Sequence, residues 1–212
     1  MTILDPRKDF KILYAPPSKA PVIVDVPEMN FLMVDGHGDP NTSAAYADAL
    51  QALYSVAYTL KFMLKKGAGM DFGVAPLEGL WWAADLDAFA NAAKDEWDWT
   101  MMIMQPPQIT PDLVSEAIHQ AAAKKDLPAV ARMRFDRFHE GLCAQIMYIG
   151  PFAAEGATIE RLHAFIHAQG YTLRDKHHEI YLSDPRRAAP DKLKTVIRQP
   201  MQPVGIPQLV IA

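Results

Sequence analysis

The sequence has a single cysteine among its 212 residues, Cys143, so no disulfide can form within the chain. It has no excess of positive charge, because 21 Lys and Arg against 25 Asp and Glu give a formal net charge of −4. A mildly acidic chain is a poor electrostatic partner for a phosphate backbone, so we expect no direct binding of nucleic acid. No stretch approaches the ~18 apolar residues of a membrane span. The first residues are charged where a signal peptide needs an apolar run, so we expect a cytoplasmic protein without a membrane partner.

Common catalytic and cofactor motifs are missing as well. The sequence contains no HExxH, no GxSxG, no phosphate-binding Walker loop and no GxGxxG. His163 and His167 lie one helical turn apart, but a lone cysteine excludes thiolate clusters, and we expect both histidines on a solvated helix face. The sequence therefore predicts neither a metal site nor a cofactor.

Half of the residues are hydrophobic and 22% are charged, which is typical of an ordinary globular chain. The 17 prolines lie mostly between periodic segments and mark loops. We expect one domain spanning residues 1–212. Its predicted elements are a strand at 31–34, a helix capped by Thr42 that runs to about 66, strands at 70–74 and 79–84, a short helix at 86–94, a strand at 97–104, a wholly helical segment at 111–138, a strand at 142–149, a helix capped by Thr158, and strands at 177–182 and 193–198.

These elements form an internal repeat. Residues 82–85 match residues 181–184, and the run Ile-x-Gln-Pro at 103–106 returns at 197–200. The first repeat covers about 22–107, a helical bridge about 111–138, and the second repeat about 140–200. The predicted fold class is α+β: duplicated strand-helix-strand-strand units form one curved antiparallel sheet, with helices on one face and a ligand cleft on the other.

Glu179 is the candidate for chemistry. The alternation of a strand places Glu179, Tyr181 and His177 on one face and Ile180 and Leu182 on the other. If the Ile and Leu side chains pack on the helices, Glu179 points into the cleft, where loss of hydration would raise its pKa and strengthen it as a base. An exposed glutamate paired with a lysine is the alternative.

Aromatic side chains could form the walls of this cleft. Trp81 and Trp82 are adjacent on a strand and must face opposite sides of the sheet. Trp82 occupies the position of Tyr181 in the repeat, so we expect it on the face of Glu179, as a stacking wall for a flat ligand. The remaining candidate ligand contacts are Trp81, Trp99, Met101, Tyr181 and His177. For the tryptophans and the methionine, packing in the core is the alternative.

Tyr148 ends a strand just before Gly150-Pro151. A phenol there could donate a hydrogen bond to a ligand or to a water molecule that Glu179 activates. A half-buried aromatic ring at the rim of the sheet is the alternative.

Four segments resemble the DNA gyrase inhibitor-like (GyrI-like) small-molecule-binding family: residues 81–86 (WWAADL), 97–106 (WDWTMMIMQP), 178–187 (HEIYLSDPRR) and 193–200 (LKTVIRQP). The resemblance covers about residues 25–200, and Glu-Ile-Tyr-Leu-Ser-Asp-Pro is its most specific part. It implies a small-molecule partner and places Glu179 at the central acidic position of the family and Tyr148 in its Tyr-x-Gly-Pro pattern. The chain is similar to the stand-alone branch, which includes cyclopropanoid cyclopropyl hydrolases. Other relatives are effector domains of regulators that bind cationic aromatic drugs.

Three functions follow from this resemblance. The chain could be a hydrolase in which Glu179 activates water against a strained ring, a binder that sequesters or senses hydrophobic and cationic molecules, or a haem carrier like a related duplicated fold. A regulator that itself contacts DNA is not expected, because the 29 residues before the first strand are too few for a helix-turn-helix domain. The sequence indicates no oligomeric state.

Overall fold

A computed structural model of the chain describes residues 3–83 and 94–205. Its residues fall into two compact units. Unit 1 comprises Met1–Lys11 and Glu28–His139, and unit 2 comprises Ile12–Pro27 and Glu140–Ala212. The short helix predicted at 86–94 lies almost wholly outside the described residues. No helix in the described part of the chain is long and apolar enough to cross a membrane.

The sheet of unit 1 is antiparallel. Its strands lie in the order β5, β6, β3 and β7, and every neighbouring pair is antiparallel. Their bounds are Leu77–Trp82 (β5), Asp98–Gln105 (β6), Met29–His37 (β3) and Arg134–Phe138 (β7). A separate parallel pair joins β1 (Ile3–Leu4) to β4 (Asp71–Phe72), and the short elements α1 (Pro6–Asp9) and η2 (Lys94–Glu96) complete the unit.

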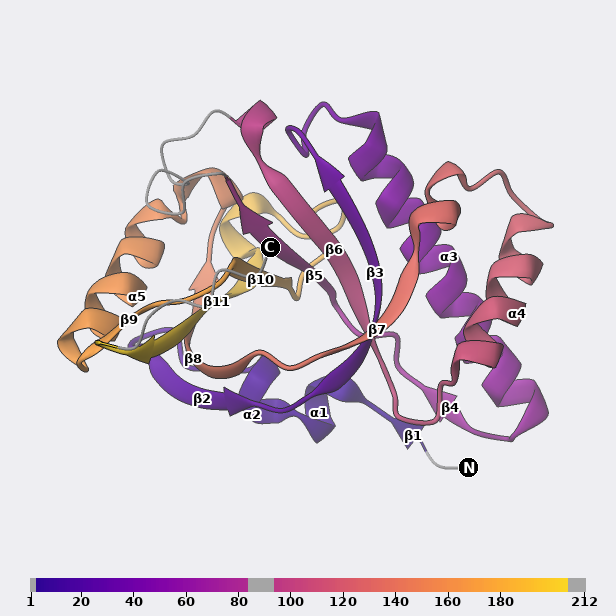
Figure 1. Cartoon of the computed structure of the whole chain (residues 1–212), viewed down its shortest axis with the longest axis horizontal. Helices are drawn as coiled ribbons and strands as arrows, with labels where there is room; N and C mark the ends of the chain where they lie inside the picture. Colours follow the sequence, from indigo (N-terminus) through magenta and orange to yellow (C-terminus); the bar gives the residue numbers. More distant parts are fainter. Residues whose placement is uncertain (1–2, 84–93, 206–212) are drawn as a thin grey trace. The chain divides into compact units, whose positions relative to one another are not determined.

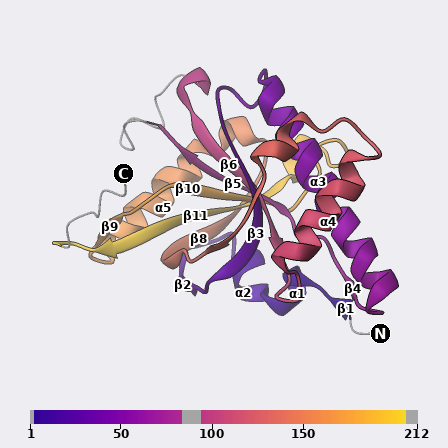
Figure 2. The same ribbon diagram turned by 45° about the vertical axis from the view of Figure 1, so that its right-hand side comes forward.

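Two helices of unit 1, α3 (Ala44–Gly67) and α4 (Pro111–Ala122), lie side by side, and α3 packs on β3 and β6 (Figures 1 and 2). Helix α3 buries Leu53, Val56 and Leu60 at the three- and four-residue spacing of an amphipathic helix. Its N-cap is Ser43, whose hydroxyl accepts from the amide of Tyr46, so the cap lies one residue after the predicted Thr42.

The prediction of a wholly helical segment at 111–138 is wrong. Helix α4 ends at Ala122, a turn of 3-10 helix follows at Pro128–Arg132 (η3), and β7 pairs with β3 along the edge of the sheet. The Leu127-Pro128 step opens the 3-10 turn, since the residue before a proline disfavours the helical region. The run Arg134–Phe138 places phenylalanines beside charged residues, which suits an edge strand with one solvated face.

The sheet of unit 2 is antiparallel too, with its strands in the order β2, β8, β11 and β10. Their bounds are Val22–Val26 (β2), Gly141–Ile149 (β8), Lys194–Pro203 (β11) and His177–Tyr181 (β10). β9 (Tyr171–Leu173) pairs with the far end of β11. The predicted strand ended at Arg198, but β11 continues past Pro200, which still sits in register opposite Cys143.

Helix α5 (Gly156–Ala168) covers one side of this sheet. Leu162 and Ile166 of α5 pack against Ala144, Ile146 and Ile197 of the strands. The helix begins directly after the 3-10 turn η4 (Phe152–Ala154), with Glu155 at the N-cap position in place of the predicted Thr158. The short elements α2 (Lys11–Tyr14) and η5 (Pro190–Lys192) complete the description.

The two units follow one plan. Unit 1 runs β3, α3, β5, β6 and unit 2 runs β8, α5, β10, β11, so the predicted strand-helix-strand-strand order is present twice. The α+β class with antiparallel sheet is thereby confirmed. One boundary differs, because β2 pairs with β8 and lies in unit 2, whereas the sequence assigned residues from about 22 to the first repeat.

Candidate functional site

The carboxylate of Glu179 in β10 is held by two neighbours on its own strand. The hydroxyl of Tyr181 donates to Glu179 Oε2 at 2.7 Å, and Nε2 of His177 lies 3.3 Å from Glu179 Oε1. The Glu179 side chain is 12% exposed. The strand therefore presents an oriented carboxylate that keeps a small contact with solvent.

Glu179 lies on the helix side of the sheet in unit 2. It stands opposite Ile197 of β11, and directly opposed residues share a face. Ile197 packs against Leu162 and Ile166 of α5. The prediction that Glu179 points away from the helices is therefore wrong.

The reason is that the other face of β10 is covered as well. Ile180 and His178 on that face are buried, and Arg198 beside them donates to the carbonyl oxygen of Leu13 in α2. Ile180 therefore lies on the face of Arg198, which the N-terminal segment of unit 2 contacts at Leu13, and not on the face that packs on α5. Alternation alone identifies two faces but does not say which of them a helix covers.

The pKa of Glu179 moves opposite to the expected direction. Burial acts to raise it, but the hydrogen bond and charge of His177, the Tyr181 hydroxyl and a hydrogen bond with Glu155 outweigh burial and lower the pKa below its ordinary value. Glu179 is therefore an anion at neutral pH. The raised pKa that would strengthen Glu179 as a base is therefore not observed, and what the structure provides is a fixed orientation of the carboxylate.

Tyr148 of β8 lies in one row with the site. Tyr148, Thr195 and Tyr181 oppose one another across β8, β11 and β10, on the face of Glu179. The Tyr148 hydroxyl donates to the carbonyl oxygen of Pro151 at 2.9 Å. Burial and the charge of Glu155 raise the pKa of Tyr148, so Glu155 influences both Tyr148 and Glu179.

Gly150 allows Tyr148 to fold back over the turn. The φ angle of Gly150 is 151°, and a Cβ there would lie 2.5 Å from the Tyr148 hydroxyl oxygen. The Gly-Pro pair after the strand is therefore needed for the position of the phenol.

Some site residues carried no signal in the sequence analysis. Phe152 of η4 packs edge-on against Tyr181 with ring centroids 5.6 Å apart. The Thr195 hydroxyl is completely buried and has no hydrogen-bond partner among the residues that the structure describes. Phe152 directly follows the Gly-Pro pair, and Thr195 lies on the strand opposite Tyr181, so pairing β10 with β11 could have found it.

Trp81, Trp99 and Met101, which were predicted as ligand contacts, lie in the core of unit 1. Trp81 and Trp99 oppose each other on β5 and β6, and both rings contact Tyr46 of α3, with centroids 6.1 and 5.3 Å from that of Tyr46. Trp99 and Met101 have no exposed surface, and Trp81 is 4% exposed. The Trp99 indole also covers Gly36, where a Cβ would lie 2.1 Å from the ring. These positions match the packing alternative, and their role as ligand contacts stays a prediction.

Trp82 faces the other way. It alternates with Trp81 and stands opposite Asp98, on the side of the sheet away from α3, and it is half-buried. The two tryptophans thus lie on opposite faces, as expected. The equivalence of Trp82 with Tyr181 is wrong, because Tyr181 lies on the helix side of its own unit and Trp82 does not.

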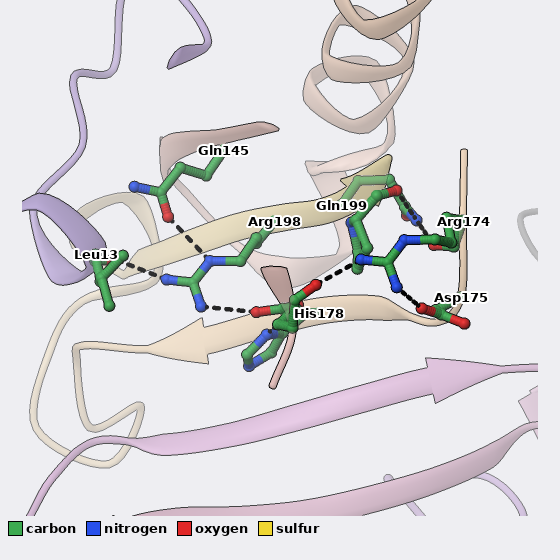
Figure 3. Close-up of polar contacts among 9 residues, drawn as sticks. Leu13, Gln145, Arg174, Asp175, His178, Arg198 and Gln199 are labelled. Carbon is green, nitrogen blue, oxygen red and sulfur yellow. Dashed lines mark hydrogen bonds and ion pairs between the residues drawn. The ribbon is translucent and has the colours of Figure 1, made fainter. Parts of the chain in front are cut away.

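A second polar network lies on the opposite face of unit 2 from Glu179. Arg198 donates to Glu140 Oε2, to Gln145 Oε1 and to the Leu13 carbonyl oxygen, each at 3.0 Å, as Figure 3 shows for the labelled residues Arg198, Gln145 and Leu13. Nδ1 of His178 lies 2.9 Å from Glu140 Oε1. Burial acts to raise the pKa of Glu140, but His178 and Arg198 outweigh it and lower the pKa to about 2.

Within residues 3–83 and 94–205, no group of three or more His, Cys, Asp or Glu side chains is arranged so that it could hold a metal ion. His163 and His167 of α5 differ from the expected solvated pair. His167 is exposed, but His163 is half-buried, and burial, together with His177 and His167, lowers the pKa of His163 to about 4.

Residues 19–201 match the model of the GyrI-like small molecule binding domain. The chain belongs to this GyrI-like family. The match spans both strand-helix-strand-strand units, including Glu179 and Tyr148. No curated protein matches the chain.

Several solved structures resemble the chain over almost its whole length. A conserved protein from Listeria innocua is 42% identical, with a TM-score of 0.85 over 94% of this chain and 100% of the other. A hydrolase encoded by lin2189 of the same organism is 42% identical, with a TM-score of 0.83 over 95% and 100%. The C-terminal domain of EcmrR, at 10% identity and a TM-score of 0.54 over 87% and 98%, shares the fold alone.

Proposed function

We propose that the GyrI-like chain binds small hydrophobic or aromatic molecules, electrophilic or cationic, next to Glu179, and that it hydrolyses cyclopropane-bearing alkylators there. The observation that supports this best is the Glu179 carboxylate, fixed by Tyr181 and His177 and left 12% exposed beside aromatic rings. A carboxylate with both oxygens oriented is suited to accept a proton from water. The hydrolase from Listeria innocua, 42% identical, supports the same reaction class.

In the proposed reaction, water attacks the unsubstituted carbon of a strained ring that is conjugated to a carbonyl group. Glu179 takes one proton of the water as the new C–O bond forms. The C–C bond of the ring breaks, and its electron pair moves into the conjugated carbonyl oxygen. That oxygen then receives the proton from Glu179, so the net change is the addition of one water molecule. The strain of the ring supplies driving force, so the base needs to contribute only a part of the rate.

Tyr148, Tyr181 and Phe152 would form the apolar surroundings of the ligand. The unpartnered Thr195 hydroxyl, which lies between the two tyrosines in their row and is buried within the described chain, offers a polar contact on the same face. The Tyr148 hydroxyl already donates its one hydrogen to the carbonyl oxygen of Pro151. It could donate to a ligand only if that hydrogen bond were broken.

The test is product analysis after incubation with a cyclopropane-containing alkylator. Wild-type protein should give a ring-opened, hydroxylated product with multiple turnovers. Glu179→Gln should lower the rate by roughly 10²–10⁴-fold, the usual contribution of a general base. Glu160→Gln, which changes an exposed glutamate of α5, is the matched control and should keep the rate. Product formation by Glu179→Gln at the wild-type rate would exclude Glu179 as the base.

A second candidate function is binding without catalysis. The lowered pKa of Glu179 favours it, because a permanent anion among aromatic rings suits a cationic ligand and is a weaker base. In that case Glu179→Gln should weaken binding of an aromatic cation by about 1–3 kcal/mol and leave a neutral aromatic ligand unaffected. Neither form would then turn over the alkylator.

A further inference from the structure

His177 is close to Glu179 but has little surface of its own. It begins β10, lies two residues before Glu179 and so shares its face, and is 5% exposed. Its Nε2 lies 3.3 Å from Glu179 Oε1. A side chain buried to this degree can act on a ligand chiefly through the carboxylate beside it.

The contact can orient one oxygen of the carboxylate. A carboxylate oxygen only accepts, so in a hydrogen bond between the two groups the ring nitrogen is the donor. His177 therefore holds one oxygen of Glu179, while the Tyr181 hydroxyl holds the other at 2.7 Å. With one partner for each oxygen, the plane of the carboxylate is set before any ligand arrives.

His163 of α5 is a second imidazole that interacts electrostatically with His177. Its Nε2 is buried and has no hydrogen-bond partner in the described part of the chain. Its pKa, lowered to about 4 by burial and by His177 and His167, keeps it neutral at pH 7. His163 therefore does not bring a second positive charge to Glu179.

The other groups facing Glu179 do not supply positive charge either. Glu155, before α5, is a second carboxyl group, and Tyr148 of β8 is a phenol whose pKa is raised. The neighbouring β11 contributes Thr195, Ile197 and Gln199, which do not ionise. Among these described neighbours, His177 adds an electrostatic attraction to the anion, beyond the hydrogen bond that Tyr181 donates.

We infer that His177 is a positioning residue, which orients the carboxylate of Glu179 for the water-activating step. The inference rests on the proposed function for its chemical consequence. The contact itself can be tested without any turnover.

The experiment follows the titration of the Glu179 side-chain carboxyl by 13C NMR. Its resonance is identified as the one that is missing from the spectrum of Glu179→Gln. His177→Phe removes the ring N–H and the charge, so the midpoint should rise by about one to three pH units, the usual effect of an opposite charge at this distance. His177→Gln keeps a neutral donor and should give a smaller rise. His167→Gln, an exposed histidine on α5, is the control and should leave the midpoint in place.

An unchanged midpoint in folded His177→Phe would overturn the inference. If that variant does not fold, the titration midpoint of His177→Gln is compared with that of the control His167→Gln. A higher midpoint in His177→Gln supports the role of His177, and an equal midpoint overturns it. Where the alkylator is turned over, the acid limb of the kcat profile should move with the midpoint, while KM changes less than kcat. A wild-type protein without turnover would overturn the proposed function, yet the titration would still test the inference on His177.

Discussion

Two glutamates in unit 2 face opposite sides of one sheet and differ in how completely they are bound. Glu140 is 1% exposed, and its two oxygens contact His178 and Arg198 at 2.9 and 3.0 Å. Glu179 is 12% exposed and is held by a phenol and an imidazole. Both have a lowered pKa, so the pKa direction alone does not separate them. What separates them is the remaining contact with solvent.

In β10, His178 faces the fully bonded Glu140, and Glu179 on the other face keeps some contact with solvent. The guanidinium of Arg198 uses Nε, Nη1 and Nη2 within the protein, so this cation of the Glu140 face is already committed to partners in the described chain. The face with Glu179 keeps an accessible carboxylate, phenol groups and a buried hydroxyl. A carboxylate buried with all its partners is a structural element, whereas one that is oriented but accessible is a candidate for function.

The largest expected effect is on the buried pair. Glu140→Gln leaves Arg198 buried without its charged partner, so the free energy of unfolding should fall by about 3–5 kcal/mol. Urea denaturation followed by circular dichroism would measure it. Arg137→Met, which breaks the exposed Arg137–Glu28 pair, is the control and should change the stability by less than about 1 kcal/mol. Equal effects of the two changes would contradict the expected difference between a buried and an exposed ion pair.

The contribution of the Glu140 carboxylate to stability should also depend on pH. The pKa of Glu140 is about 2 in the folded chain and 4.5 in its ordinary state, so the unfolded chain binds the proton more readily. The stabilisation is complete above pH 4.5 and is lost as the pH falls towards about 2, by about 3 kcal/mol in all. The stability difference between wild type and Glu140→Gln should therefore be constant at neutral pH and shrink over this window. A difference that does not change with pH would show that the effect of the substitution is not electrostatic.

A smaller effect is expected at the turn beside the site. Gly150→Ala places a side chain at a φ of 151° and against the Tyr148 hydroxyl, so unfolding should become easier by about 1–3 kcal/mol. Gly156→Ala, at the start of α5, meets no atom within 4 Å and is the control. Thermal unfolding would compare the two. If the Gly150→Ala variant were as stable as wild type, the phenol could move away at little cost.

The smallest effect on stability is expected at Glu179. Glu179→Gln keeps an oxygen that can accept from Tyr181 and a residue in partial contact with solvent, so the stability should change by at most about 1 kcal/mol. Denaturation of the same preparation used for product analysis would measure it. A loss as large as that of Glu140→Gln would place Glu179 among the structural carboxylates.

The sequence predicts the repeat and the strands with strong alternation. The strands predicted at 142–149 and 177–182 correspond to β8 and β10, although β10 ends one residue earlier, at Tyr181. The edge strand β7 was missed, since its pairing with β3 depends on a residue more than 100 positions away in the chain and not on local propensity. Helix caps were misplaced by one to three residues because several polar residues compete near each start.

The candidate site was predicted in its members and not in its orientation. The positions of Glu179, Tyr181 and His177 on one face follow from alternation, and the structure agrees. Which face α5 covers depends on Leu13 and Arg198 closing the other side, a contact across 185 positions that no local pattern encodes. The lowered pKa of Glu179 was missed for a related reason, because the identity of its partners outweighs its burial.

The alternation of β11 has a consequence for how the strands find their partners. Thr195, Ile197 and Gln199 belong to the side of α5, and Arg198 belongs to the side of Glu140. If β11 slipped by one residue during folding, Arg198 would enter the apolar layer under α5, and its charge would have no carboxylate there. The buried ion pair thus acts against misregistered pairing, and it secures the alignment that sets Thr195 beside Tyr181. A sequence in which Arg198 and Glu140 were both replaced by apolar residues could be as stable, yet it would lose this discrimination between registers.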